Sequence, residues 1–297
     1  MPRPLIQLNH LCVLDCSGAD VETFLQGQLT CDVNKITSDA ATFAAHCNPQ
    51  GRVRFIGFLI KSEDHFYLIL PHSIADQALS DLKKYAAFSK TKIEKNASIN
   101  LYGIVDKDTD IPETNCASLP DERKIIYITT SQESFLKEKL DSYLQGNDDR
   151  NRDEQSINNG TALWHYYDIV SGFPQVYPDT YETFVAQRLN LQCVGGISFK
   201  KGCYIGQEII ARIHFLGQLK HHMFLGKTTP EKTLNAGDGL YDENDSSIAT
   251  VVDAAVFEDT QYVLFVMQDK ELQNAIYTKE KQIVLLQPLP YELEESR

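Results

Sequence analysis

Hydrophobic and polar residues follow two rhythms along the chain, and together they predict a mixed α and β protein. Behind S-x-x-D capping boxes at 17–20 and 73–76, apolar residues recur at helical spacing, which predicts a helix after each box. The turn residues 48–51 lie between two β-rich runs and predict a hairpin. Strands are predicted for the β-rich runs 11–14, 42–47, 53–60, 65–70, 99–105 and 125–128.

The pattern changes in the second half of the chain. Apolar positions behind Ser131 predict another helix, and the polar, charged stretch 146–160 predicts a surface loop. Beyond His222, β-rich runs separated by turns predict a small antiparallel barrel or sandwich. These runs are 223–227, 248–257, 261–267 and 282–286. The fold class is therefore predicted to be α+β, with a C-terminal β domain.

Composition narrows the class of protein. The chain has 297 residues, of which 42% are hydrophobic and 23% charged, as in a folded protein of about two domains. Its net charge of −13 argues against bulk, non-specific binding to nucleic acid, although a local basic patch is compatible with RNA. No apolar run approaches the ~18 residues of a membrane helix, and no secretory signal is visible. We therefore expect a cytoplasmic protein with no membrane partner.

The cysteines do not form a recognisable framework. There are seven, an odd number, without a C-x-x-C pair or a zinc spacing with the histidines. This pattern excludes a disulfide scaffold and predicts no metal held by this chain alone. We expect every cysteine except Cys203 to be a small, buried apolar residue.

Chemistry is concentrated in residues 195–222. This segment has one acidic residue, Glu208, and a formal charge of +3. Its four basic residues are Lys200, Lys201, Arg212 and Lys220. A cationic island in an acidic protein favours an anionic ligand.

Cys203 lies between glycines within this island, and the apolar pattern behind Gly206 predicts a helix starting nearby. A helix N-terminus and neighbouring lysines both favour a thiolate, which can act as nucleophile, metal ligand or redox group. The alternative is a packed turn with solvated lysines, and the residues alone leave both open.

A resemblance adds to this interpretation. Residues 200–208 (K-K-G-C-Y-I-G-Q-E) resemble the K-G-C-Y-x-G-Q-E signature of the YgfZ family, the folate-binding group related to the T-protein (aminomethyltransferase) of the glycine cleavage system. Residues 24–33 (F-L-Q-G-Q-L-T-C-D-V) are similar to the family's N-terminal stretch, and 189–192 and 288–291 also fit. The resemblance implies three modules around a central channel, two mixed α/β units and a C-terminal antiparallel β-barrel. The corresponding segments are 1–110, 111–222 and 223–297.

The resemblance also implies a function. Members of the family are tetrahydrofolate-binding accessory factors that support assembly or repair of iron–sulfur proteins and, through them, tRNA modification. The implied partners are iron–sulfur proteins, including tRNA-modifying enzymes, with only an indirect link to tRNA. Cys203 is the implied functional thiol. The implied folate-binding residues are Trp164, Leu11, Lys200, Lys201, Gly202, Tyr204, Gly206, Gln207, Glu208 and Arg212.

The folate site differs from the family pattern at two positions. Trp164 matches the family's folate-site tryptophan. It is also the chain's one tryptophan, and an aromatic face suits a pterin ring. An ordinary core tryptophan is the alternative. Leu11 stands where the family has a second tryptophan, so stacking is lost there. Val170 stands where T-proteins carry a glutamate that anchors the pterin.

Two other functions compete. T-proteins carry an Asp pair where this chain has Phe55 and Ile56, and losing that acid or base costs about 10²–10⁴-fold in rate. This disfavours an aminomethyltransferase. Direct RNA binding through the basic residues of 195–222 is the third hypothesis, and the acidic net charge disfavours it.

Overall fold

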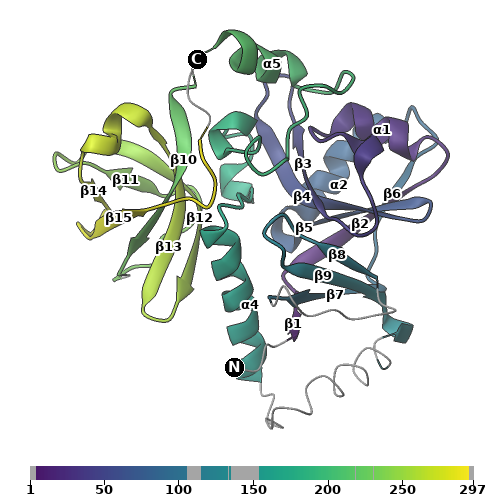
Figure 1. Cartoon of the computed structure of the whole chain (residues 1–297), viewed down its shortest axis with the longest axis horizontal. Helices are drawn as coiled ribbons and strands as arrows, with labels where there is room; N and C mark the ends of the chain where they lie inside the picture. The colour runs from purple at the N-terminus through teal and green to yellow at the C-terminus, as the bar shows by residue number, and fades with distance from the viewer. Residues whose placement is uncertain are drawn as a thin grey trace. The chain divides into compact units, whose positions relative to one another are not determined.

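The structure, a computed structural model, describes residues 5–105, 115–132, 134, 154–217, 219–229 and 231–293 (Figure 1). The chain divides into two compact units built from interleaved segments. Unit 1 comprises Met1–Val21, Lys35–Thr42 and Phe58–Trp164, and unit 2 comprises Glu22–Asn34, Phe43–Gly57 and His165–Arg297. The boundaries 110 and 222 of the three modules stay a prediction.

Unit 1 contains a four-stranded antiparallel sheet in the order β1-β7-β9-β8. Its central strands are rich in isoleucine and tyrosine, and one face buries Tyr102, Ile104, Ile126 and Ile128. The strands are β1 (Leu5–Gln7), β7 (Ile99–Ile104), β9 (Lys124–Thr129) and β8 (Cys116–Ser118). The predicted strands at 99–105 and 125–128 are therefore confirmed.

A five-stranded sheet has the order β3-β4-β5-β2-β6. Helix α2 (His72–Ala86) contacts its strands β2, β5 and β6 within unit 1, and buries Ile74, Ala78 and Leu82 from its apolar stripe. The strands are β2 (Leu11–Ser17), β3 (Thr42–Cys47), β4 (Val53–Ser62), β5 (His65–Pro71) and β6 (Lys92–Lys95). The predicted hairpin is confirmed, and β6 was not anticipated.

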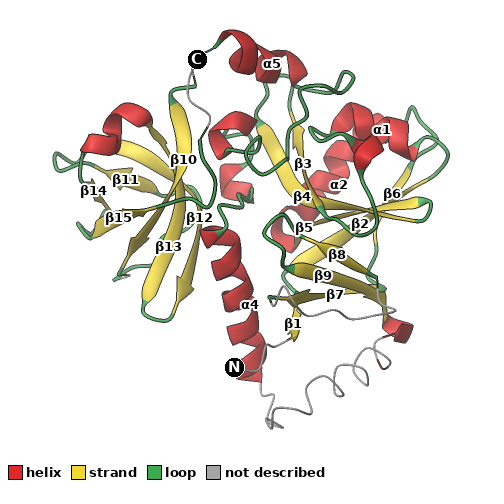
Figure 2. Ribbon diagram, in the orientation of Figure 1, coloured by secondary structure: helices red, strands yellow, loops and turns green. Residues whose placement is uncertain are grey.

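A closed six-stranded antiparallel barrel fills the C-terminal part of unit 2 (Figure 2). Its interior is apolar, with Val251, Phe265 and Met267 fully buried. The strand order is β10 (His221–Thr228), β13 (Thr260–Gln268), β12 (Ser247–Phe257), β11 (Gly239–Tyr241), β14 (Ile276–Tyr277) and β15 (Ile283–Gln287). This confirms the predicted barrel and the α+β fold class.

The remaining helices are α1 (Val21–Gln28), α4 (Glu154–Val170) and α5 (Gln207–Leu216). The short 3₁₀ turns are η1 (Val33–Lys35), η2 (Thr130–Gln132), η3 (Pro178–Thr180), η4 (Ala186–Leu189) and η5 (Asp269–Gln273). Of the helices described, none has the length and apolar character needed to cross a bilayer.

The predicted loop at 146–160 is wrong at its end, because α4 begins at Glu154. Polar residues without proline can extend a helix, and each added residue contributes one backbone hydrogen bond. Most of the helix predicted behind Ser131 lies outside the described residues.

Candidate functional site

The signature segment is folded as a closed turn that leads into α5. The backbone N–H of Tyr204 donates to Gln207 Oε1 (3.2 Å), and the N–H of Gln207 donates to the Tyr204 carbonyl (3.2 Å). Tyr204 is buried, and Lys201 Nζ lies 5.0 Å from the centre of its ring. The tyrosine and glutamine of the motif therefore fix the loop on which Cys203 sits.

Gly206 is required by two constraints at the start of α5. Its φ is +84°, and a Cβ there would lie 2.7 Å from the Asn48 carbonyl oxygen and 3.0 Å from Cys47 Cβ. The Gly206 carbonyl also accepts the hydrogen bond from Ile210 N–H (3.2 Å). Since only glycine tolerates both the left-handed backbone and this close approach, Gly206 seats α5 against the β3–β4 hairpin.

Lys201 joins the signature to the N-terminal motif. Its Nζ donates to the carbonyl oxygens of Leu29 (2.7 Å) and Cys31 (2.6 Å). The N–H of Ile205 donates to the Gly27 carbonyl (3.2 Å). Burial lowers the pKa of Lys201 to about 8. This lysine therefore uses its donors to tie two distant sequence motifs together.

Thr30 makes a second connection between the same motifs. Its hydroxyl donates to the Gly196 carbonyl (2.6 Å) and accepts from Ala45 N–H (3.1 Å). Its carbonyl accepts from Ser198 N–H (2.9 Å). Thr30 is fully buried, so these bonds hold the approach to the signature loop firmly on β3.

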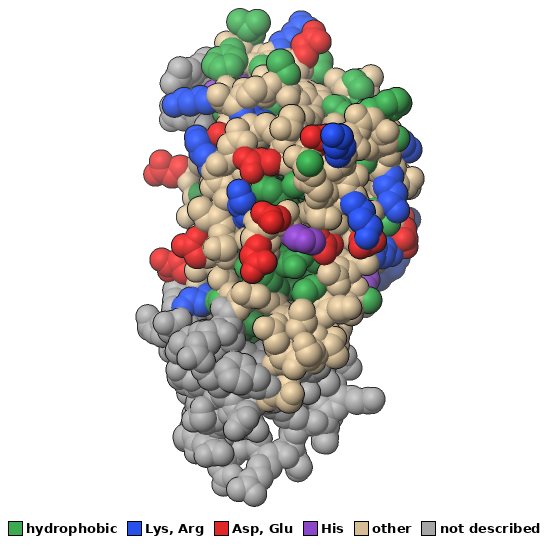
Figure 3. Space-filling view, turned by 90° about the vertical axis from the view of Figure 1, so that its right-hand side faces the viewer, with side chains coloured by type: hydrophobic (Ala, Val, Ile, Leu, Met, Phe, Trp, Pro, Cys, Tyr) green, Lys and Arg blue, Asp and Glu red, His purple; other side chains and the backbone are tan. Residues whose placement is uncertain are grey.

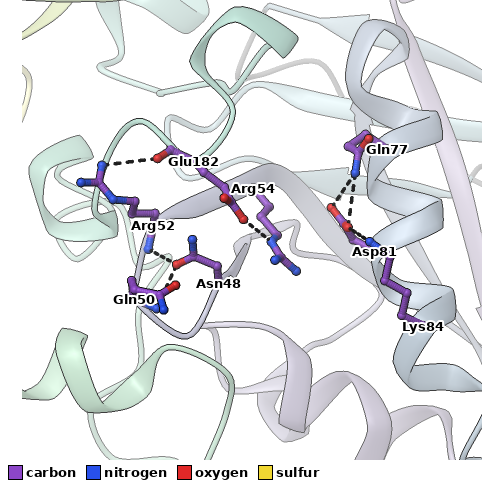
Figure 4. A network of polar contacts seen from close by, with 8 residues as sticks. All are labelled: Asn48, Gln50, Arg52, Arg54, Gln77, Asp81, Lys84 and Glu182. Atoms are coloured by element: carbon purple, nitrogen blue, oxygen red, sulfur yellow. Dashed lines mark hydrogen bonds and ion pairs between the residues drawn. The ribbon is translucent and has the colours of Figure 1, made fainter.

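The hairpin turn beside Gly206 is stabilised by its own polar contacts (Figure 4). Asn48 Oδ1 accepts from the N–H groups of Gln50 and Arg52, both at 3.0 Å. Arg54 Nε donates to Glu182 Oε1 at 2.7 Å. The predicted turn at 48–51 is thus confirmed, with an asparagine side chain closing it.

Cys203 differs from the other cysteines in its exposure. Cys12, Cys16, Cys31 and Cys47 are buried, Cys116 and Cys193 are half-buried, and Cys203 is exposed. Burial raises the pKa of Cys31 and of Cys47 to about 12, which keeps both protonated. All seven are free thiols. Of the seven, Cys203 is therefore the one that is exposed, and it lies on the loop that the sequence singled out.

The surroundings of Cys203 are open. A Cβ added at Gly202 would meet nothing within 4 Å. The turn 204–206 separates Cys203 from the first residue of α5, Gln207. Lys200, Glu208 and Arg212 are exposed. The thiol is accordingly accessible to a large reactant.

Charges of both signs are interspersed on the face of the molecule shown in Figure 3. Within residues 195–222, Lys200, Arg212 and Lys220 are exposed and form no ion pair among the described residues. The cationic island expected from the sequence is therefore a solvent-facing one, apart from Lys201.

Trp164 is fully buried in unit 1. The Arg123 guanidinium carbon lies 4.3 Å from the ring centre, and Arg123 Nη1 donates to the Trp164 carbonyl (3.2 Å). A Cβ at Gly103 would collide with the ring, which shows that β7 is pressed against it. Stacking of a pterin on Trp164 therefore requires Arg123 to leave the ring.

The two departures from the family pattern occupy ordinary structural positions. Leu11 is half-buried at the start of β2, and Val170 is half-buried at the end of α4. Phe55 and Ile56 are fully buried on β4, so this part of the strand offers no acid or base.

A buried polar cluster escaped the sequence analysis. Asp253 on β12 binds His165 Nε2 through Oδ1 (3.0 Å) and accepts from the Tyr177 hydroxyl through Oδ2 (2.9 Å). Burial alone would lower the pKa of His165, but the Asp253 carboxylate outweighs it and raises the value to about 9. The available signal was an aspartate inside the apolar run of β12.

Tyr291, in the segment 288–291 that fits the family, contacts the turn after α4. Its hydroxyl donates to the Gly172 carbonyl (3.0 Å), and a Cβ at Gly172 would overlap its ring at 2.7 Å. Gly172 has φ +67°, so the turn formed after α4 by Gly172, Phe173 and Pro174 needs glycine at its first position. Within the described part of the chain, no three His, Cys, Asp or Glu side chains gather to hold a metal ion.

Comparison with known proteins places this arrangement in a family. The tRNA-modifying proteins YgfZ of Escherichia coli strains S88 and ED1a are each 32% identical over 311 residues, covering 99% of this chain and 95% of the relative. No family model matches. The glycine cleavage system aminomethyltransferase T of Bartonella henselae has the same fold, with a TM-score of 0.64, 14% identity, and coverage of 98% of this chain and 87% of that one. The chain belongs to the YgfZ family.

Proposed function

We propose that this protein is a tetrahydrofolate-binding accessory factor that supports assembly or repair of iron–sulfur proteins and, through them, tRNA modification. The observation that carries the proposal is the exposed Cys203 thiol on a loop fixed by Lys201, Tyr204 and Gln207. Four other cysteines are buried. A single presented thiol suits transient chemistry on a partner, because one cysteine is too few to hold a cluster alone.

The relatives support the part of this proposal that concerns tRNA modification. Proteins 32% identical across nearly the whole chain are named as tRNA-modifying, which supports a role connected with tRNA modification. The net charge of −13 favours an indirect role over direct binding to tRNA. Cytoplasmic iron–sulfur enzymes are the partners we propose.

Tetrahydrofolate is the proposed ligand, and its binding depends on Trp164 and Arg123. A pterin gains access to the indole face when the guanidinium moves away, and an aromatic face then supplies stacking. Lys200 and Arg212, which the resemblance implies as further folate-binding residues, are both exposed. When bound, tetrahydrofolate supplies a one-carbon carrier, and this chain's residues bind and orient it.

One experiment tests the thiol. Cells lacking the protein receive the wild type, Cys203→Ala or the matched control Cys193→Ala, and tRNA methylthiolation is measured by mass spectrometry of nucleosides. We expect wild type and Cys193→Ala to restore the modification and Cys203→Ala to fail at equal protein level. Full restoration by Cys203→Ala would refute the role of the thiol.

A second experiment tests the ligand and the competing enzyme. Titration with tetrahydrofolate should quench the fluorescence of Trp164, the one tryptophan of the chain. No binding at millimolar tetrahydrofolate would reject the folate proposal. Formation of methylene-tetrahydrofolate from an aminomethyl-lipoyl donor at ordinary enzymatic rates would instead favour the aminomethyltransferase, against the buried Phe55 and Ile56.

A further inference from the structure

The end of α5 exposes large apolar side chains. Phe215 is 66% exposed and Leu216 is 85% exposed, whereas Ile210 on the same helix is fully buried. Exposing two adjacent large apolar residues leaves a favourable burial unused, about 25 cal/mol per Å². Such a patch beside polar neighbours is typical of a contact surface.

Phe199 extends this patch toward the signature loop. Its ring stacks on His214 with 3.6 Å between centroids, and its centroid lies 6.4 Å from that of Phe215. We define Phe199, Phe215 and Leu216 as the α5 cap. Phe199 and Cys203 are close in sequence, so their Cα atoms are at most about 14 Å apart.

Positive charges accompany the α5 cap. Lys200 follows Phe199, Arg212 precedes Phe215 by one helical turn, and Lys220 follows the helix. All three are exposed and unpaired among the described residues. The protein as a whole carries −13. An apolar centre with a cationic rim is therefore complementary to an apolar pocket with an acidic rim.

We propose that the α5 cap docks a protein partner whose contact surface is an apolar pocket bordered by Asp and Glu residues. The proposal rests on the proposed function, since it places that partner within reach of the Cys203 thiol. A second copy of this chain fits less well, because a symmetric contact would bring the same cations face to face. Nucleic acid fits less well, because the protein carries a net charge of −13 and Leu216, which is more exposed than Phe215, offers no aromatic face for a base to stack on.

Photo-crosslinking identifies the occupant. Leu216 is replaced by benzoylphenylalanine, which keeps the position apolar, and intact cells that lack the native protein are irradiated. We expect an adduct with a second polypeptide, which mass spectrometry identifies and which is then purified as the binding probe. A nuclease-sensitive adduct, an adduct of two copies of this chain, or no adduct would each overturn the proposal.

The purified partner then gives affinities without folate or tRNA in the assay. The double variant Phe215→Ser, Leu216→Ser should bind at least about 10-fold more weakly, since hot-spot residues dominate such interfaces. Arg212→Glu should also weaken binding, and the wild-type affinity should fall with salt. Leu272→Ser, at a 42% exposed leucine on η5, is the matched control and should bind like the wild type.

Two results separate this proposal from the proposed function. Equal affinity of the wild type and the cap double variant would overturn the docking surface even if tRNA modification still depends on Cys203. Cys203→Ala should bind the partner normally, because the thiol lies outside the α5 cap. Partner binding through the cap would stand even if Cys203→Ala restores tRNA modification.

Discussion

Replacing Gly206 by alanine tests the assembly of the signature loop most directly. The substitution puts a methyl group on a residue at φ +84°, 2.7 Å from the Asn48 carbonyl oxygen. The left-handed conformation costs about 1–2 kcal/mol for a residue with a Cβ. The overlap is with backbone, which cannot rotate away, and shifting it adds about 1–3 kcal/mol. Together they predict a loss of about 2–5 kcal/mol in the free energy of unfolding.

The matched control lies in the same motif. Gly202→Ala adds the same methyl group where nothing lies within 4 Å and where φ is not in the left-handed region. Its effect should stay within about 0.5 kcal/mol, as at other open surface positions. The comparison therefore isolates backbone conformation and contact at Gly206 from the general effect of losing a glycine.

Thermal and urea unfolding followed by circular dichroism measure both variants. At about 2–4 °C per kcal/mol, Gly206→Ala should lower Tm by roughly 4–20 °C. Equal melting temperatures of Gly206→Ala and the wild type would refute the close packing of the signature turn on the hairpin. An equal loss in Gly202→Ala would refute the argument from contact, because that position has no neighbour to meet.

Three further predictions follow from other contacts. His165 should contribute stability that is fully present below pH 6.5, its unfolded value, and is lost as the pH rises through about 9; the stability difference between wild type and His165→Gln in urea should therefore be present at pH 6 and vanish by pH 10. A disulfide reagent should label one thiol quickly in the native protein and none quickly in Cys203→Ala, whereas seven should react after unfolding. Trp164→Ala should cost about 3–5 kcal/mol in urea unfolding, because the ring is fully buried.

Local patterns predicted the elements that periodicity and turn chemistry define. The hairpin around Asn48, the barrel strands and the start of α5 near Gly206 follow from alternation, turn residues and a glycine before an apolar helix. Strand β14 has only two residues, Ile276–Tyr277, which is too short to show an alternation of apolar and polar residues. Its position is set by its neighbours β11 and β15, and local sequence carries no such information.

The candidate site was predicted in part. The sequence singled out Cys203, and the structure shows it exposed. It did not indicate that Lys201 is directed to the carbonyls of Leu29 and Cys31, because charge counting treats every lysine as solvated. Nor did it pair Asp253 with His165, since the two are far apart in sequence and meet only when the barrel forms.

The separation of roles between Lys200 and Lys201 explains how one short motif can both fold and act. Lys201 is half-buried and donates to the carbonyls of Leu29 and Cys31, so its removal should cost about 1–3 kcal/mol of stability. Lys200 is exposed and unpaired among the described residues, so its removal should leave stability unchanged. The two adjacent lysines thus have different roles. Lys201 fixes the loop that carries the thiol, and Lys200 remains available to a ligand or partner. The loop is therefore held from its buried side by Lys201, while Cys203 on the same loop is exposed to a reactant.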